Sequence, residues 1–150
     1  MPAFQKKPKR RVISAPKFYL FDVGVANYLL NRSKIEEKTE LFGKAFEHFI
    51  YQEIFAYSHY SDKNFTISYW RTASGIEVDF VLGDAEVIIE VKATDEVKNR
   101  HLNGLKAFME EYTVKKAIIV SSDPFPRQVG DVLVLPWKEF LQKLWGGEIL

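Results

Sequence analysis

The architecture of this chain follows from two short runs, Gly75-Ile76-Glu77-Val78-Asp79-Phe80-Val81-Leu82 and Val87-Ile88-Ile89-Glu90-Val91-Lys92. Both runs alternate with a period of two, which is typical of β-strands. Gly83-Asp84 lies between them and is a short turn signal. The sequence therefore predicts two antiparallel strands joined by a tight hairpin.

Three charged side chains are predicted to share one face of this hairpin. Glu90 and Lys92 are two residues apart and so point the same way. A two-residue loop at 84–85 or a four-residue loop at 83–86 places Asp79 directly opposite Glu90. A loop of 83–84 makes Asp79 a diagonal neighbour instead, within roughly 8 Å. Val81 and Ile88 share this face, which argues against a fully solvated surface.

Two carboxylates that face each other on a sheet repel. A divalent cation between Asp79 and Glu90 would remove that conflict, and Lys92 would then stand beside the ion. The alternative is an ordinary solvated strand face, and the spacing alone does not decide between the two.

The hairpin also carries a family resemblance. Asp79, a gap of about ten residues and then Glu90-x-Lys92 resemble the pattern of the PD-(D/E)xK nuclease superfamily. Four runs, in this order, are similar to the DUF4143 domain: Lys17-Phe18-Tyr19-Leu20-Phe21-Asp22-Val23-Gly24, Gly43-Lys44-Ala45-Phe46-Glu47, Tyr69-Trp70-Arg71-Thr72 and Glu77-Val78-Asp79-Phe80. That domain usually forms the C-terminal part of archaeal and bacterial AAA-type ATPases.

The resemblance implies a restriction-endonuclease-like core of order αβββαβ, and it assigns roles. Glu47 matches the acid of the first motif, Asp79 that of the second, and Glu90 with Lys92 the third. The implied activity is hydrolysis of DNA phosphodiester bonds, with Mg²⁺ or Mn²⁺ held by the three carboxylates and Lys92 as the base or electrostatic stabiliser. The alternative is a non-catalytic module that binds DNA or docks onto an AAA-type ATPase. A component of a toxin–antitoxin or defence system is a third possibility.

The remaining sequence predicts a mixed sheet flanked by helices, an α/β fold. Residues 41–57 show a broad apolar stripe typical of a helix packed on a sheet, with Glu47 at the edge of the stripe. Further elements are expected as helices at 22–30, 96–112 and from Pro136 to Gly146-Gly147, and as strands at 65–71, 117–120 and 132–135. Residues 31–40 are expected to form a loop.

Basic side chains suggest weaker contacts with nucleic acid. Residues 1–16 are rich in Lys and Arg, including Arg10 and Arg11, and we interpret them as a flexible leader or linker stub before a domain at 17–150. Arg71 is a candidate phosphate ligand, or else a structural partner of Glu77 or Glu53. Lys106 is a further candidate without a motif to support it.

Composition limits the remaining classes of function. The chain has 150 residues, a net charge of +1 and no cysteine, so thiolate zinc sites and disulfides are excluded and a cytoplasmic location is expected. No apolar run is long enough to span a bilayer, so we expect no membrane contact. Gly43-Lys44 lacks the flanking residues of a phosphate loop, so no ATP hydrolysis is expected. The oligomeric state does not follow from these residues.

Overall fold

The computed structural model of the chain describes residues 1–6, 9–20, 22, 24–25, 36 and 39–150. These residues form one six-stranded mixed sheet with the spatial order β1-β2-β3-β4-β6-β5. Its strands are β1 (Ile67–Arg71), β2 (Glu77–Leu82), β3 (Val87–Lys92), β4 (Lys116–Ser121), β5 (Arg127–Val129) and β6 (Val132–Pro136). The three central strands β3, β4 and β6 are parallel, and the other neighbouring pairs are antiparallel.

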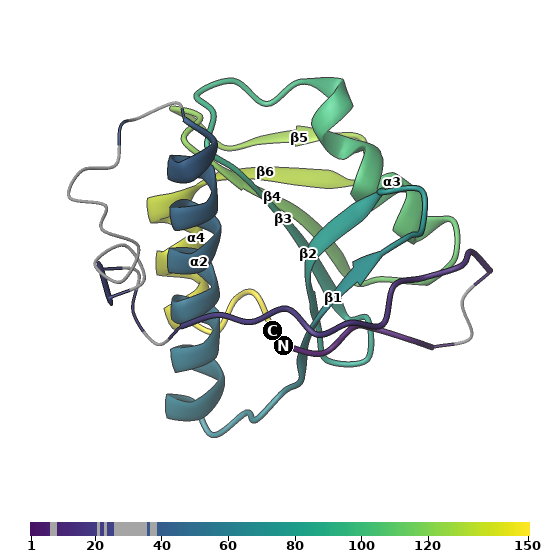
Figure 1. Cartoon of the computed structure of the whole chain (residues 1–150). Coiled ribbons are helices and arrows are strands. Elements are labelled where there is room, and N and C mark those ends of the chain that lie inside the picture. The colour runs from purple at the N-terminus through teal and green to yellow at the C-terminus, as the bar shows by residue number, and fades with distance from the viewer. Residues whose placement is uncertain (7–8, 21, 23, 26–35, 37–38) are drawn as a thin grey trace.

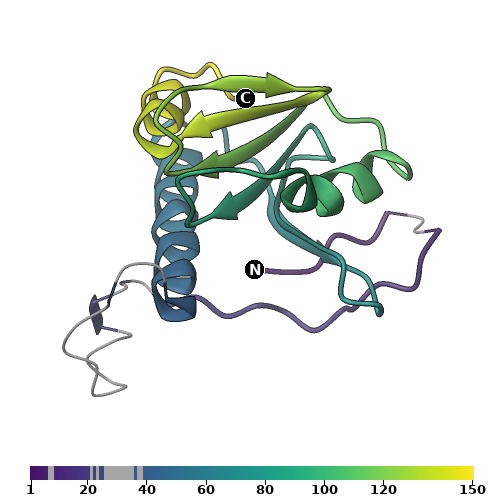
Figure 2. The ribbon, with the colours of Figure 1, turned by 90° about the horizontal axis from the view of Figure 1, so that it is seen from above.

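Helices cover both faces of this sheet. They are α2 (Glu40–Tyr60), the 3-10 helix η1 (Asn99–Leu102), α3 (Asn103–Met109) and α4 (Trp137–Trp145). Helices α2 and α4 lie on one face and α3 on the other, as Figures 1 and 2 show. Each face has its own apolar core, with Ile54 and Phe140 on the α2 side and Leu105 and Phe108 on the α3 side. The predicted α/β architecture with a mixed, helix-flanked sheet is confirmed.

Helix α2 carries the first site candidate. It begins where Thr39 accepts a hydrogen bond from the Phe42 amide at 3.1 Å, an N-cap that supplies one of the acceptors the first turn lacks. Ile50 and Ile54 are fully buried against the sheet. Glu47 stands one turn earlier, with its side chain 24% exposed, so it reaches from the edge of the core into the space beside the strands.

The β2–β3 hairpin has the four-residue loop that was one of the predicted alternatives. Leu82 pairs with Val87, and Phe80 pairs with Ile89. Gly83 and Ala85 adopt positive φ angles of 62° and 65° in the loop, a conformation that glycine tolerates without strain. This register places Asp79 and Glu90 at opposing positions of the two strands.

A β-bulge in β2 changes the alternation of that strand. On β1, Ser68 pairs with Val81 and Trp70 pairs with Val78, so Tyr69 alone opposes both Asp79 and Phe80. Consequently Val78 and Val81, three residues apart, belong to the same core. Bulges of this kind re-aim side chains near functional sites, and here Asp79 is one of the two bulged residues.

The segment predicted to be a flexible leader is packed onto the sheet. We call its described residues, 1–6 and 9–16, together with residues 17–20, the N-terminal strap. The strap lies along the free edge of β1, where Tyr69 and Pro2 are joined by a backbone hydrogen bond of 3.1 Å and the Ile13 amide donates to Arg71 at 2.8 Å. Phe4 is 9% exposed and belongs to the core. The prediction of a free leader is therefore wrong for these residues, because they cover an otherwise unpaired sheet edge.

Other predicted elements differ in extent. The helix expected at 96–112 is shorter, since Thr94 accepts from the Glu96 amide and Asp123 accepts from the Val97 amide before η1 begins. Strand β5 was not predicted. The helix expected at 22–30 and the loop at 31–40 lie largely outside the described residues. Helix α4 begins after Pro136 and ends at Gly146, as predicted.

Candidate functional site

The site lies at the open end of the β2–β3 hairpin, away from the connecting loop, where the pairing of the two strands stops. The Val91 amide donates to Asp79 Oδ2 at 2.8 Å, so the side chain of Asp79 takes the place of a ladder bond. Asp79 is only 6% exposed. The carboxylate is thus held in a fixed position beside the opposing strand.

Glu90 is the most constrained acid of the site. It is 6% exposed, and its Oε1 forms an ion pair with Lys92 Nζ at 2.5 Å. Its Oε2 is buried and has no hydrogen-bond partner among the described residues. Helix α3 lies very close to this region. An added Cβ at Gly104 would lie 1.9 Å from the Glu77 carbonyl oxygen and 3.6 Å from Glu90 Oε2. Glycine is therefore required for the approach that buries Glu90.

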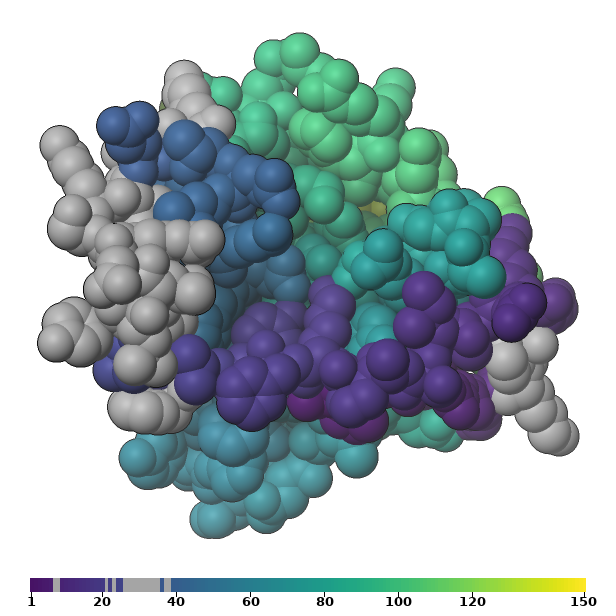
Figure 3. Space-filling view, in the orientation of Figure 1, coloured from purple at the N-terminus to yellow at the C-terminus, as the bar shows by residue number. Residues whose placement is uncertain are grey.

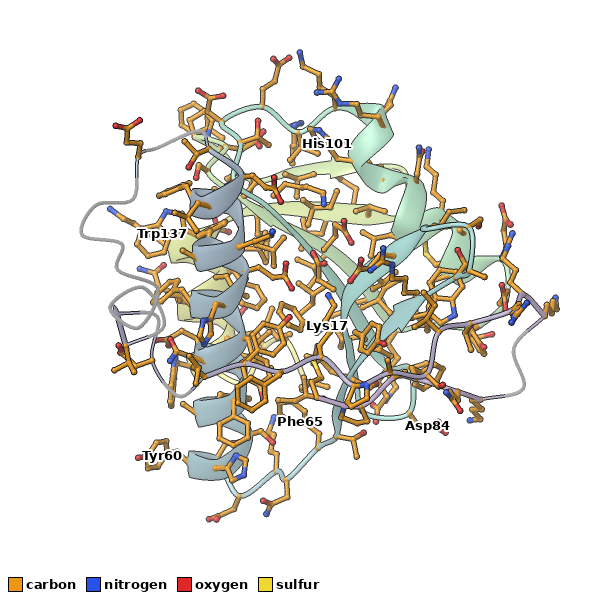
Figure 4. All side chains as sticks on the ribbon, viewed as in Figure 1. Lys17, Tyr60, Phe65, Asp84, His101 and Trp137 are labelled. Atoms are coloured by element: carbon orange, nitrogen blue, oxygen red, sulfur yellow. The ribbon has the colours of Figure 1, made fainter. Side chains whose placement is uncertain are left out.

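Lys17 of the strap lies among three carboxylates. Its Nζ is 3.3 Å from Glu47 Oε1 and 3.9 Å from Asp79 Oδ1, and it also contacts Glu77 Oε1. Figure 4 shows Lys17 in the space between α2 and the strands. Tyr19, two residues further on, donates its hydroxyl to Glu47 Oε1 at 2.5 Å. The strap thus supplies both a cation and a hydrogen-bond donor to the α2 side of the site.

The two buried acids resist ionisation. Burial, with repulsion from Glu90 and Glu47, raises the pKa of Asp79 well above its usual value. Burial also raises the pKa of Glu90 to about 6, against the attraction of Lys92. Both shifts arise first from the removal of the carboxylates from water, which the attraction of the nearby lysines does not fully offset.

The two lysines of the site stay protonated at neutral pH. Burial opposes the charged form of Lys92, but Glu90 and Asp79 outweigh it and raise its pKa. The pKa of Lys17 is raised in the same way, since burial is outweighed by Glu47, Glu77 and Asp79. Both side chains therefore act as cations rather than as bases near pH 7.

The site opens on both sides of the sheet edge. A cleft of about 600 Å³ on the α2 side is lined by Lys17, Glu47 and Asp79 among others. A second hollow of about 490 Å³ on the α3 side is lined by Glu90 and Arg100, and again by Asp79. Figure 3 shows the strap crossing from α2 to the strands on one face of the molecule. Asp79, Glu77 and Lys92 line both openings, so the hairpin end separates two accessible spaces.

The four predicted catalytic residues are gathered at this edge, but not as one cluster of ligands. Asp79, Glu90 and Lys92 come together on the hairpin, while Glu47 is linked to Asp79 through Lys17. Within the described part of the chain, no three Asp, Glu, His or Cys side chains converge in a way that could hold a metal ion. The ammonium of Lys17 lies between the carboxylates that were predicted to share a cation.

The weaker nucleic-acid candidates fall in different places. Arg71 lines the α2-side cleft and its Nε is 3.7 Å from Glu77 Oε2, the structural partner foreseen as its alternative. Arg10 is engaged by Glu110 and Glu111 at 2.5 and 2.6 Å. Arg11 is exposed, and its carbonyl accepts from the Ala73 amide. Lys106 is exposed on α3, on the far side from Glu47.

Three residues of the site were not predicted to belong to it: Lys17, Tyr19 and Glu77. Lys17 and Tyr19 are within the first run that resembles the DUF4143 domain, so the sequence marked both residues, but no role in the site was predicted for them. Glu77 precedes Asp79 by two residues in β2, and its alternation with Asp79 is the signal that could have marked it.

Comparison with known proteins places the chain in a family of unknown function. A family model described as "Domain of unknown function (DUF4143)" matches residues 42–140, and the chain belongs to this family. Searches of curated proteins and of solved structures gave no match. No helix of the described residues has the length and apolar character needed to cross a membrane.

Proposed function

We propose that this domain binds a divalent cation, Mg²⁺ or Mn²⁺, at Asp79 and Glu90 and hydrolyses phosphodiester bonds of DNA, as a member of the PD-(D/E)xK superfamily with a restriction-endonuclease-like core. One observation carries the proposal. A buried carboxylate oxygen, Glu90 Oε2, has no hydrogen-bond partner among the described residues although it stands beside a second buried acid and a lysine. Buried polar atoms of native proteins almost always have a partner.

The residues fit a hard cation. Carboxylate oxygens are the ligands that Mg²⁺ and Mn²⁺ prefer, and one or two carboxylates suffice for Mg²⁺ because it keeps several waters. Burial raises the pKa values of Asp79 and Glu90 despite the nearby lysines, and perturbed acids of this kind are common at functional sites. A bound cation would supply that charge and would neutralise the charge developing on a phosphate.

The role of Lys92 follows from its protonation. Its ammonium is held by Glu90 at 2.5 Å, and its pKa is raised rather than lowered. In the metal-free site Lys92 is therefore a cation placed to stabilise negative charge. Around the cleft, Lys44 and Arg71 are further exposed cations that a DNA backbone can contact.

A second candidate function is a DNA-binding or docking module of an AAA-type ATPase that does no cutting. It is favoured by Lys17, which already neutralises carboxylates that a cleaving site would give to the metal. The net charge of +1 favours the docking form of this module, because both a nuclease and a DNA-binding module must hold a polyanion.

The test has two stages. Calorimetric titration with MnCl₂ should show binding to the wild type and to Asp84→Asn, but not to Asp79→Asn. Asp84 is a matched control because it lies in the same hairpin, exposed and paired with Lys6. Binding that is absent from the wild type, or that survives in Asp79→Asn, would reject the metal site.

The second stage separates cutting from holding. Linear, single-stranded and branched DNA are incubated with wild type, Lys92→Met and Lys115→Met in Mn²⁺. Lys115 is exposed and paired with Glu86, so that variant should retain the wild-type rate. Loss of cleavage in Lys92→Met alone supports the nuclease. DNA binding without cleavage by the wild type supports the module instead.

A further inference from the structure

Lys17 holds the position among the acids that a free cation would otherwise take. We infer that Lys17 is a built-in counter-ion of this site and that its ammonium competes with a divalent cation for the carboxylates, so that the N-terminal strap regulates metal binding. The competition rests on the proposed function, which supplies the metal site, whereas the counter-ion role does not.

Geometry places the two cations in competition for Asp79. Lys17 Nζ is 3.9 Å from Asp79 Oδ1 and 3.3 Å from Glu47 Oε1. A divalent ion sits about 2.0–2.6 Å from its oxygen ligands, so an ion on Asp79 Oδ1 would lie close to the ammonium in a partly buried space. Like charges at that separation repel strongly where water is scarce. The ammonium of Lys17 therefore opposes binding of the ion at Asp79.

The strap fixes Lys17 through contacts of its own. The Lys17 amide donates to Met1 O at 3.0 Å, and the N-terminal ammonium of Met1 donates back to Lys17 O at 2.8 Å. The Tyr69 hydroxyl donates to Ala15 O, and the Lys17 ammonium lies 5.2 Å from the centre of the Tyr69 ring. Loosening these contacts would free the ammonium without changing any carboxylate of the site.

Two variants test the competition. Lys17→Met removes the ammonium, and Tyr69→Phe removes the hydrogen bond to Ala15 but keeps the aromatic ring. Lys6→Met is the matched control, since Lys6 belongs to the same strap but pairs with exposed Asp84 at 2.5 Å. In MnCl₂ titrations we expect Lys17→Met to bind about tenfold more tightly, because a competing state no longer reduces the apparent affinity. Tyr69→Phe should bind more tightly by a smaller factor, and Lys6→Met should match the wild type.

A metal-free measurement keeps the counter-ion role separate from the proposed function. In EDTA, Lys17→Met should melt several degrees lower than Lys6→Met, because its carboxylates lose their neutralising charge. The double variant Lys17→Met/Glu47→Gln should recover part of the lost melting temperature. If no variant binds Mn²⁺ but this pattern of melting holds, the metal site fails and the counter-ion role stands.

Two results would overturn the inference. The first is equal Mn²⁺ affinity of wild type and Lys17→Met, which removes the competition and leaves the metal site intact. The second is equal melting of Lys17→Met and Lys6→Met in EDTA, which removes the counter-ion role.

Discussion

Asp123 and Glu90 are buried equally, each 6% exposed, but their carboxylates differ in how many hydrogen bonds and charges surround them. Asp123 follows β4 and accepts from the Val97 amide at 3.0 Å and from the Ser121 hydroxyl at 2.9 Å. Arg127 completes the set with a contact of 2.8 Å. Glu90, on the neighbouring strand β3, has one charged partner and one oxygen with none among the described residues.

The difference separates a structural acid from a candidate ligand. A buried charge is tolerated when hydrogen bonds and an opposite charge replace the water it loses. Asp123 meets that condition and joins the start of η1 to the segment after β4. Glu90 meets it only in part, because Lys92 pairs with Oε1 while Oε2 has no hydrogen-bond partner among the described residues. Burial alone is therefore not informative about function, whereas burial without compensation is.

The largest effect is expected where α3 presses on the site. Gly104→Ala would place a Cβ 1.9 Å from a backbone oxygen, so α3 must move away from β2. We expect a loss of unfolding free energy of about 3 kcal/mol, typical of severe overpacking, together with a lower pKa of Glu90 as water enters. Urea unfolding and carboxyl NMR titration measure the two.

Gly43→Ala is the control for this change. Gly43 lies in α2 with nothing within 4 Å of an added Cβ, and alanine in a helix should stabilise by about 0.5–1 kcal/mol. Equal stability of the two glycine variants would show that the close approach of α3 does not constrain the site.

The structural acid should be the next most costly to remove. Asp123→Ala leaves the Val97 amide and the Arg127 guanidinium without their acceptor, so we expect a loss of about 2–3 kcal/mol in urea unfolding. Asp131→Ala, at an exposed position, should change stability by less than about 0.5 kcal/mol. A small effect at Asp123 would contradict the contrast drawn between the two acids.

Glu90→Gln should act in the opposite direction. The pKa of Glu90 is raised from 4.5 to about 6 in the folded state, so the folded protein binds more protons than the unfolded chain in that window. Metal-free stability should therefore fall as pH rises from 4.5 through 6, by on the order of 2 kcal/mol. Glu90→Gln should lose this contribution, while Asp79 keeps its own, and should be more stable than wild type at pH 7. A variant that is less stable than wild type at pH 7 would show that Glu90 is compensated after all.

The smallest effect is expected at an exposed ion pair. Glu86 and Lys115 are 2.5 Å apart with side chains 43% and 74% exposed. Glu86→Gln should cost no more than about 0.5 kcal/mol, and 1 M NaCl should abolish the difference. A larger cost would mean that the surface pairs of this protein cannot serve as neutral controls.

Local patterns predicted the centre of the fold well. The alternation in 75–82 and 87–92 predicted both strands of the hairpin and the shared face of Asp79 and Glu90, while the register was one of the alternatives left open. The apolar stripe of α2 located Glu47. These features depend on neighbouring residues, and short-range periodicity records them.

The remaining features depend on contacts between distant segments. The bulge at Asp79 is set by the pairing of β2 with β1, and Lys17 reaches the acids only because the strap pairs with β1. A basic, proline-interrupted run also has the composition of a linker, so its packing on the sheet is decided by Phe4 and by the unpaired edge. Residues in such contacts carry no periodic signal.

The four-residue connection between β2 and β3 has a kinetic consequence. The two acids at the hairpin end are near neighbours in sequence, whereas the strap and α2 reach them from much further along the chain. Because local contacts close faster than distant ones, we expect the acids to meet before Lys17 arrives to neutralise them. Repulsion would then slow the refolding of metal-free protein, and added salt would accelerate it.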